Sequence, residues 1–394
     1  MKELFQIPPG WQWEEFRNVA RVVSDLVKPQ DYPNASHIAP NHIEAKTGRL
    51  LPYSTVAADG VSSVKNRFYA GQILYSKIRP YLAKAALVDF DGVCSADMYP
   101  INTELDPGYL HRWMLTPEFT AAAAQNQGRN LLPKINVKEL SSLPVPVPPA
   151  FVQKQIAALL DQVDALREMR RKAIALLDDF TQSNFIDMFG DRSEIYRRWP
   201  KARLGEMLEF LTSGSRGWAA HYVDEPGSLF LRIQNVRGGE LLLDDVAYVN
   251  PPDTAEARRT QVQPGDVLLS ITADLGRTAV VPGELDQAFI NQHLSILRTT
   301  SLNPHFLSAF LESPFGHEKI LGRNRQGVKA GLNFDDVRSL ETPCPPIELQ
   351  EEFAKRIKLG RELRELHRAH LAELDGLFAC LQHRAFRGEL WPGA

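Results

Sequence analysis

Two long stretches of the chain place apolar residues at alternating steps of four and three positions. In residues 150–190 these positions are Val152, Ile156, Leu159, Val163, Leu166, Ala173, Leu177 and Phe180. In residues 347–390 the same register is kept by Leu349, Phe353, Leu363, Leu374 and Leu377. Polar or small residues interrupt the second pattern at Arg356, Gly360, His367 and His370. The spacing is that of a coiled-coil seam, so the pattern predicts two long helices.

The two helical stretches are copies of each other. A proline-rich segment precedes each one, at residues 143–149 and 340–346, and the offset of 197 residues holds for Gln153/Gln350 and Phe189/Phe386. A duplication of about half the chain predicts a pseudo-symmetric molecule. The seams could pair with each other in antiparallel fashion, or each helix could pack separately on its own domain. Polar residues at one level of both seams (Arg170, His367) favour pairing, because a polar layer fixes register.

The stretches outside these helices have a different pattern. Short β-rich runs such as 71–75 and 267–271 are separated by turn residues, and helical pieces follow near 107–126 and 303–322. The repeat continues here, but its offset drifts between 188, 194, 196 and 197 residues. The predicted fold class is α+β, with two pseudo-symmetric mixed α/β domains separated by two long antiparallel coiled-coil helices. We place the domains at 1–149 and 191–346 and the helices at 150–190 and 347–390.

Composition narrows the class of protein only a little. The chain has 394 residues, 44% of them hydrophobic and 24% charged, as in ordinary globular proteins with more than one domain. Its three cysteines have no paired spacing, and no run of about 18 apolar residues occurs, so we expect a cytoplasmic protein. The net charge of −3 does not by itself indicate a nucleic-acid binder, because binding depends on where the charge lies.

Catalytic motifs are weak. Asn250-Pro-Pro-Asp253 resembles the motif of adenine amino-methyltransferases, but Asp253 replaces the aromatic residue that would stack on the base. No phosphate-binding glycine loop, serine nucleophile elbow or paired metal-binding histidines accompany it. We therefore expect a non-catalytic chain without a catalytic, metal-binding or cofactor-binding residue of its own.

Basic and amide side chains gather beside aromatic ones in both domains. The candidate DNA-binding residues of the first domain are Lys77, Arg79, Tyr81, Lys84, Arg129 and Lys134. Those of the second domain are Ser213, Arg216, Trp218, Arg232, Gln234, Asn235, Arg277, Arg323, Arg325 and Lys329. Arg and Lys suit guanine edges and phosphates, while Asn and Gln suit adenine edges. One such cluster alone is more often a solvated surface, but several in the variable parts of a duplicated scaffold favour DNA recognition.

With these motifs the chain resembles the specificity subunit of a type I restriction-modification system over essentially its whole length. The resemblance is carried by the segments 143–156 and 343–350, by 386–390, and by 76–80, 213–218 and 231–235. Two features depart from the family pattern. The segment 348–352 has Glu-Leu-Gln-Glu-Glu where a Glu-Gln pair is usual, and the second helical seam is more polar.

The resemblance implies separate roles for the domains, the helices and the partner subunits. Each domain would be a target-recognition domain for one half of a split, asymmetric site in double-stranded DNA, and the two helices would set the spacer between the halves. Two methyltransferase subunits would dock on the helices, and restriction-translocase subunits could join. S-adenosylmethionine, ATP and Mg would belong to those partners, and no membrane would be involved. A DNA methyltransferase-like enzyme and a protein-interaction module remain the alternatives.

Overall fold

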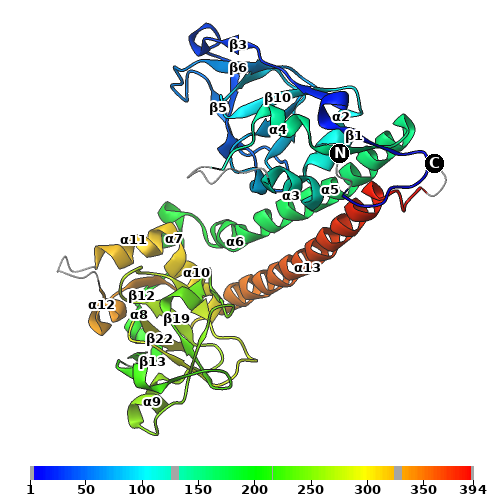
Figure 1. Cartoon of the computed structure of the whole chain (residues 1–394). Helices are drawn as coiled ribbons and strands as arrows, with labels where there is room; N and C mark the ends of the chain where they lie inside the picture. The colour runs from blue at the N-terminus through cyan, green and yellow to red at the C-terminus, as the bar shows by residue number, and fades with distance from the viewer. Residues whose placement is uncertain (1–3, 126–132, 215, 324–330, 392–394) are drawn as a thin grey trace. The chain divides into compact units, whose positions relative to one another are not determined.

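The computed structural model describes residues 4–125, 133–214, 216–323 and 331–391 (Figure 1). Two compact units divide the chain inside its long helices. Unit 1 comprises residues 1–170 and 369–394, and unit 2 comprises residues 171–368. Each unit therefore contains one globular domain and a segment of both long helical stretches. The predicted fold class, with its mixed domains and long helices, is confirmed.

Unit 1 is built on a four-stranded sheet of order β2-β10-β7-β8, a five-stranded sheet of order β3-β6-β9-β4-β5 and the pair β1-β11. Its strands are β1 Gln12–Glu15, β2 Ala20–Val22, β3 Leu26–Val27, β4 Ser36–Ile38, β5 Ser54–Thr55, β6 Lys65–Phe68, β7 Ile73–Ser76, β8 Ala85–Leu87, β9 Gly92–Cys94, β10 Met98–Thr103 and β11 Pro144–Val147. Its short helices are α1 Phe16–Val19, α2 Pro107–Met114, α3 Pro117–Gln125 and α4 Val137–Ser141, with 3-10 turns η1 Pro29–Asp31, η2 Pro40–His42 and η3 Pro80–Leu82.

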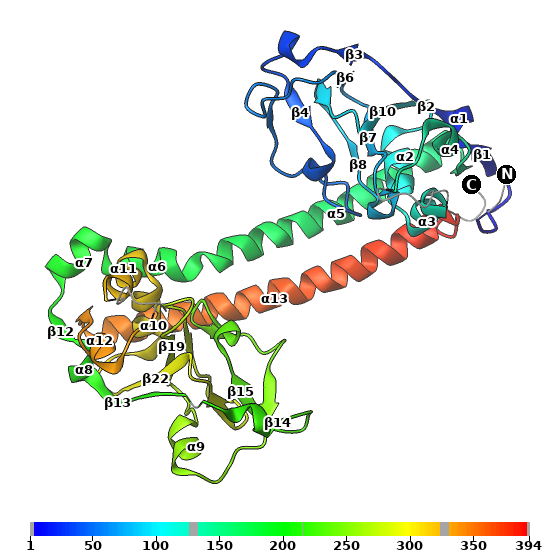
Figure 2. The same cartoon turned by 60° about the vertical axis from the view of Figure 1, so that its left-hand side comes forward.

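Unit 2 has the sheets β13-β22-β19-β20 and β14-β18-β15-β21 and the pairs β12-β23 and β16-β17 (Figure 2). Its strands are β12 Lys201–Arg203, β13 Leu208–Ser213, β14 Tyr222–Val223, β15 Ser228–Leu231, β16 Val236–Arg237, β17 Glu240–Leu241, β18 Ala247–Val249, β19 Val267–Ser270, β20 Thr278–Val280, β21 Ala288–Ile290, β22 Leu294–Thr299 and β23 Glu341–Pro343. Its short helices are α7 Arg192–Arg198, α8 Leu204–Met207, α9 Ala255–Thr260, α10 Pro304–Glu312, α11 Pro314–Gly322 and α12 Phe334–Arg338, with 3-10 turns η4 Trp218–His221 and η5 Ile233–Asn235.

The two domains share one strand order around their first four-stranded sheet. In unit 1 the central strands β10 and β7 are flanked by β2 and β8, and in unit 2 the matching strands β22 and β19 are flanked by β13 and β20. Each domain also has one parallel pair, with Ile38 opposite Cys94 and Leu231 opposite Ile290. The strands around the parallel pairs differ, since β3 and β6 have no counterpart in the order of unit 2 and β14 has none in that of unit 1. A shared frame thus carries different additions.

The long helical stretches are α5 Ala150–Asp178, α6 Phe180–Phe189 and α13 Ile347–Phe386. The sequence predicted one helix over 150–190, whereas the structure has a bend at Asp179 between α5 and α6. Helix α13 passes through Gly360 without a break. A Cβ at this position would lie 2.6 Å from the ring of Phe180, so glycine permits the close approach of that ring.

Within each unit the helical segments run antiparallel. In unit 1 the start of α5 and the end of α13 share one hydrophobic core, and further along Arg167 donates to Asp375 over 2.6 Å. In unit 2 Arg364 and Asp178 occupy the positions that are 197 residues away from that pair, and their charged atoms lie 3.7 Å apart. The same ion pair therefore occurs in both units with the roles of the two helices exchanged. Antiparallel pairing is confirmed within each unit.

The buried stripe of α5 differs from the predicted seam. Val152, Ile156 and Val163 are buried as expected, but Leu160 is buried beside them while Leu166 is 45% exposed. The difference arises because the first half of α5 packs on its own domain as well as on α13. Beyond this contact, apolar side chains of both helices stay exposed, namely Leu166, Met169, Leu176, Leu359, Leu363, Leu366 and Leu377.

Buried aromatic rings join each helical segment to its domain. Phe386 of α13 packs against Tyr109 and Trp113 of α2, with ring centroids 5.2 and 5.3 Å away. At the equivalent place in unit 2, Phe189 of α6 packs against Phe306 of α10 at 4.8 Å. Phe189 and Phe386 match at the offset of 197 residues, so the duplicated positions have the same packing role. Such aromatic contacts bury large apolar area and fix the helix on the domain.

A buried glutamine holds the start of each long helix. Gln153 donates to the carbonyl oxygen of Pro148 over 2.9 Å and accepts from the backbone of Asp106 over 2.9 Å. Gln350 makes the matching bonds in unit 2. It donates to the carbonyl oxygen of Pro345 over 2.8 Å and accepts from the backbone of Asn303 over 2.9 Å. Each amide thus ties the proline-rich segment to the N-terminal cap of α2 or α10.

Candidate nucleic-acid interface

In unit 1 the segment after β7 lies against residues 133–135. Ile78 and Lys134 form an isolated β-bridge, the amide of Arg79 donates to Pro133 over 2.7 Å, and the amide of Ile135 donates to Lys77 over 2.9 Å. These backbone bonds bring together Lys77, Arg79 and Lys134. Tyr81 follows Arg79 closely in the chain, and the carbonyl oxygen of Lys84 accepts from the amide of Ser76 over 2.9 Å, so five of the six candidate residues of the first domain lie in one region. The sequence prediction that they form one cluster therefore has a structural basis. Whether they contact DNA stays a prediction.

The side chains of this cluster differ in how far they are fixed. Arg79 and Lys134 are exposed, and Tyr81 is 44% exposed. The ammonium group of Lys84 donates to the carbonyl oxygen of Pro40 over 2.6 Å. Burial lowers the pKa of Lys84, and the positive charge of Arg79 lowers this pKa further. The cluster therefore concentrates positive charge around a few exposed groups.

Lys77 is held by neighbouring acceptors. Its ammonium group donates to the carbonyl oxygen of Ala96 over 2.6 Å and lies 3.6 Å from the carboxylate of Asp97. It also lies 5.9 Å from the ring centroid of Tyr99. Since 26% of the side chain is exposed, Lys77 can reach an anion only by exchanging part of these contacts.

Both domains place a left-handed, non-glycine residue in the same loop. Arg79 has a φ of 49° and Ala273, at the equivalent position, has a φ of 62°. The residue before each of them forms a matching isolated β-bridge, Ile78 with Lys134 and Thr272 with Gly331. A left-handed conformation costs a non-glycine residue about 1–3 kcal/mol and is typical of functional loops. The backbone therefore has the left-handed conformation at this position in both domains, while the side chain is arginine in one and alanine in the other.

In unit 2 one carboxylate organises two candidate residues. Arg232 donates to the backbone and side-chain oxygens of Asp245 over 3.1 and 3.4 Å. Gln234, which is exposed, donates to the other side-chain oxygen of Asp245 over 3.1 Å. The carboxylate itself is largely exposed, at 84%. A guanidinium and an amide are thus held side by side at the surface, which suits a base edge better than a single mobile cation would.

Two candidate residues of the second domain lie in the interior instead. The ring of Trp218 is only 5% exposed and stacks on Phe230 at 5.3 Å. The side chain of Asn235 is buried; its amide donates to Leu242 and Asp245, and its oxygen accepts from Arg232. The expectation that these two side chains present themselves at a DNA-binding surface is not met, because apolar packing and local hydrogen bonds already occupy them.

The remaining described candidates are spread over unit 2. Ser213 ends β13, and its carbonyl oxygen accepts from Arg259 over 3.4 Å. Arg216 is exposed. Arg277 donates to Asp274 over 2.6 Å in the loop that contains Ala273. Arg323 is exposed and donates to Ser339 over 3.4 Å.

Three predicted residues, Arg129, Arg325 and Lys329, lie outside the described residues. The Asn250–Asp253 segment lies at a turn before α9. Asp253 is 93% exposed and pairs with Arg258, while Thr254 caps the helix by accepting from Ala257 over 3.1 Å. Among the described residues, no group of three His, Cys, Asp or Glu side chains is placed to hold a metal ion. No helix in this described part is long and apolar enough to cross a membrane.

The loop at 271–276 is the counterpart of the Arg79 loop and was not among the predicted site segments. Thr272 in this loop hydrogen-bonds His293 over 2.5 Å, and Asp274 holds Arg277. The offset of 194 residues that aligns Ser76 with Ser270 also aligns Arg79 with Ala273, so the signal was present. It was overlooked because alanine has no polar group that would single it out.

Comparisons with known proteins agree with this architecture. Residues 44–177 match the family described as the type I restriction modification DNA specificity domain. The type I restriction enzyme EcoDI specificity subunit of Escherichia coli is 48% identical over 202 residues, which cover 50% of this chain and 45% of that protein. The putative MjaX specificity subunit of Methanocaldococcus jannaschii is 21% identical over 406 residues, covering 95% of this chain and 92% of the relative. The chain thus spans less than half of the first relative and most of the second.

Solved structures share the fold over the whole chain. The type I restriction-modification S subunit from M. genitalium has a TM-score of 0.60 at 14% identity, covering 98% of this chain and 99% of that chain. A structure from a study of complex assembly and conformational transition of the type I R-M system has a TM-score of 0.62 at 21% identity, with coverage of 98% and 99%. These two structures show the fold that the chain shares with them. Residues 44–177 belong to the family described as the type I restriction modification DNA specificity domain, and the sequence relatives are specificity subunits of type I systems.

Proposed function

We propose that this chain recognises a bipartite, asymmetric sequence in double-stranded DNA and provides the scaffold for the methyltransferase and restriction subunits of a type I complex. One observation carries the proposal: two copies of one scaffold share a strained loop but differ in its side chain, Arg79 in one and Ala273 in the other. A common frame with different surfaces suits two different half-sites. The family assignment supports the same function.

Base recognition would use the surface groups around these loops. Arg79 can donate two parallel hydrogen bonds to a guanine edge. Gln234 can form one donated and one accepted hydrogen bond with an adenine edge. Asp245 holds Gln234 beside Arg232 and so reduces the entropy that the amide would lose on binding. Lys77, Lys84 and Lys134 would contact phosphates and position the duplex.

The long helices would carry the partners. Leu166, Met169 and Leu176 of α5 are 45%, 58% and 75% exposed, and Leu359 and Leu366 of α13 are 65% and 50% exposed. Exposed apolar side chains of this size are typical of protein–protein interfaces. We assign these faces to methyltransferase subunits. In this proposal the chain is non-catalytic and cytoplasmic, and S-adenosylmethionine, ATP and Mg are bound by the partner subunits.

Methylation mapping tests the proposal. The chain is co-expressed with its methyltransferase subunit, and methylated adenines are located by long-read sequencing. We expect one asymmetric motif made of two short halves separated by a fixed number of unspecified base pairs. A continuous motif would refute the bipartite reading, and methyl transfer by the purified chain alone would favour the enzyme alternative instead.

Point variants assign the halves. Arg79→Ala should weaken methylation through one half-site and Gln234→Ala through the other, each by about 1–3 kcal/mol if the contact to the base is bidentate. Arg79→Lys is the matched control, because lysine keeps the charge but loses the two-pronged geometry. If Arg79→Lys behaves like the unaltered chain while Arg79→Ala weakens all sequences equally, Arg79 contacts phosphate and not a base.

A further inference from the structure

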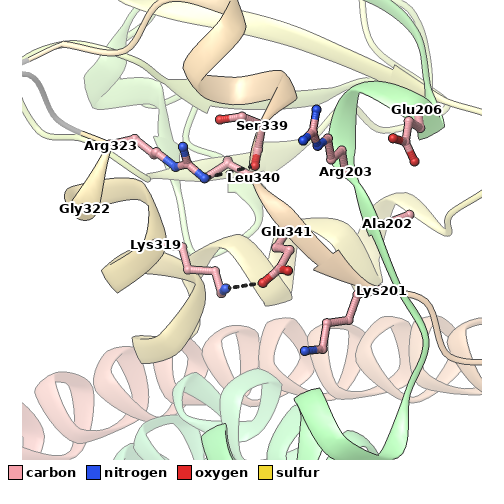
Figure 3. A pocket seen from close by; sticks show the side chains of 10 residues that line it. All are labelled: Lys201, Ala202, Arg203, Glu206, Lys319, Gly322, Arg323, Ser339, Leu340 and Glu341. Carbon is pink, nitrogen blue, oxygen red and sulfur yellow. Dashed lines mark hydrogen bonds and ion pairs between the residues drawn. The ribbon is translucent and has the colours of Figure 1, made fainter.

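Unit 2 contains a basic pocket of about 540 Å³ that the sequence analysis did not single out. We define it by six charged residues, which are Lys201, Arg203, Glu206, Lys319, Arg323 and Glu341. Figure 3 shows Lys319 and Arg323 on one side, Lys201 and Arg203 on the other, and Glu341 between them. Four cations and two carboxylates leave this small surface with a net charge of +2, although the whole chain carries −3.

Regular secondary structure sets the spacing of the four cations. Lys201 and Arg203 are two residues apart in β12, so both side chains leave the strand on the same face. Lys319 in α11 and Arg323 at its C-terminal cap are four residues apart, which places them on one face of the helix. Strand β23 lies next to β12 and pairs Glu341 with Arg203. The pocket is therefore held by four elements rather than by a loop, since Glu206 comes from α8.

The effect of this charge is visible at Glu341. Its carboxylate accepts a hydrogen bond from Lys319 over 2.9 Å. That bond is the main reason why the pKa of Glu341 is lowered, and the charges of Lys319, Lys201 and Arg323 lower it further. Three cations thus act on one carboxylate, and positive charge exceeds negative charge in the pocket.

Unit 1 does not repeat the pocket. The positions that match Lys201, Arg203, Lys319 and Glu341 in the duplicated scaffold are Trp13, Glu15, Ala122 and Pro144. Trp13 packs in the core of unit 1 against Trp113 at 6.1 Å, and Glu15 pairs with Arg17. A partner that binds both halves in the same way would require the same residues in both. The ligand of the basic pocket is therefore specific to unit 2.

We propose that the basic pocket binds a phosphate group, namely a backbone phosphate of the DNA beside the half-site that unit 2 recognises. This inference rests on the proposed function. Phosphate oxygens are the usual acceptors for Arg and Lys in protein–DNA contacts. Arg203, Lys201 and Arg323 are exposed, so the pocket is open to a long polyanion such as a DNA strand. The phosphate contact orients unit 2 on the duplex and carries no sequence information of its own.

The test uses the complex of the full chain with its methyltransferase subunits and compares DNA affinity over a range of salt concentrations. Each lost phosphate contact lowers the slope of log affinity against log salt by about 0.9. Arg203→Gln should lower the slope by about this amount and weaken cognate and unrelated DNA equally. Glu206→Gln removes a negative charge from the same pocket and should strengthen both. The methylated sequence should be the same in all three proteins.

The outcomes separate this proposal from the proposed function. If the unaltered complex neither binds nor methylates a bipartite site, the proposed function fails. If the unaltered complex binds and methylates a bipartite site, and both variants have the same salt slope and DNA affinity as that complex, the phosphate site is refuted while the proposed function stands. Titration with inorganic phosphate, followed by calorimetry, tests a free anion as the ligand. Phosphate binding that Arg203→Gln abolishes, together with an unchanged DNA salt slope, would overturn the assignment to the DNA backbone.

Discussion

The buried amide of Gln350 allows a quantitative prediction about the attachment of α13. Gln350→Leu keeps most of the side-chain volume but removes the bonds to Pro345 and Asn303, of 2.8 and 2.9 Å. The side chain is only 1% exposed, so water does not replace these bonds. Each bond contributes about 1 kcal/mol, and a buried backbone group left without a partner costs about 1–3 kcal/mol. Leucine recovers part of this through apolar burial, so we expect a net loss of about 2–4 kcal/mol.

Equilibrium urea unfolding, together with amide hydrogen exchange in the first turn of α10, measures this loss. The amide of Leu307 bonds to Asn303 over 3.0 Å and reports on that turn. Gln153→Leu is the matched variant in unit 1 and should cost about the same, because its two bonds are of the same kind and length. A loss below about 0.5 kcal/mol for Gln350→Leu would refute the argument that the amide holds the helix start.

Gln350→Glu provides an internal control. A carboxylate still accepts from Asn303 but faces the carbonyl oxygen of Pro345 without a proton to donate. We expect it to be at least as destabilising as leucine at neutral pH and to regain stability when acid protonates it. If the glutamate variant is as stable as the unaltered chain at neutral pH, the assigned donor and acceptor roles are wrong.

Three further predictions concern charged or titratable groups. Glu240→Ala and Arg361→Ala each remove an ion pair of 3.0 Å and should cost about 1–2 kcal/mol, with a double-mutant cycle in urea unfolding giving a coupling of about 1 kcal/mol. Burial raises the pKa of Glu312, so its ionisation opposes folding; stability should fall as pH rises through the raised pKa, and Glu312→Gln should flatten that part of the pH–stability curve. Burial lowers the pKa of His111 to about 4, so stability should fall as pH drops from about 6.5 towards 4, and thermal melting of His111→Gln should show a smaller fall.

The duplicated framework could be predicted from the sequence because both copies kept the residues that make the same contacts. Gln153 and Gln350 hold matching proline carbonyls, and Phe189 and Phe386 pack on matching helices. Such positions are conserved between the halves at one constant offset, since the geometry of helix on domain leaves little freedom. The constant offset therefore identifies structural positions from the sequence alone.

Side-chain direction within the candidate site could not be predicted in the same way. Trp218 and Asn235 have the residue types of a DNA-binding surface, yet one stacks on Phe230 and the other satisfies local backbone groups. Aromatic and amide side chains serve cores, turns and nucleic-acid contacts equally well, so type alone does not decide among them. The basic pocket was not predicted because Lys201, Lys319 and Glu341 are far apart in sequence. They meet only in the fold, where β23 pairs with β12 and Glu341 of β23 accepts a hydrogen bond from Lys319 of α11.

One helix position shows how identical frames come to hold different domains. Asp164 in α5 and Arg361 in α13 occupy the same place in the repeat but carry opposite charges. Asp164 accepts from Arg112 of its domain over 3.1 Å, whereas Arg361 lies 3.0 Å from Glu240 of the other domain. The partner position differs as well: uncharged Ala309 stands where unit 1 has Arg112, and the acidic partner Glu240 comes from β17. If the helix carried Arg361 at the position of Asp164, the largely buried Arg112 would face a second arginine and would have neither a carboxylate partner nor water. Each domain is therefore matched electrostatically to its own helix.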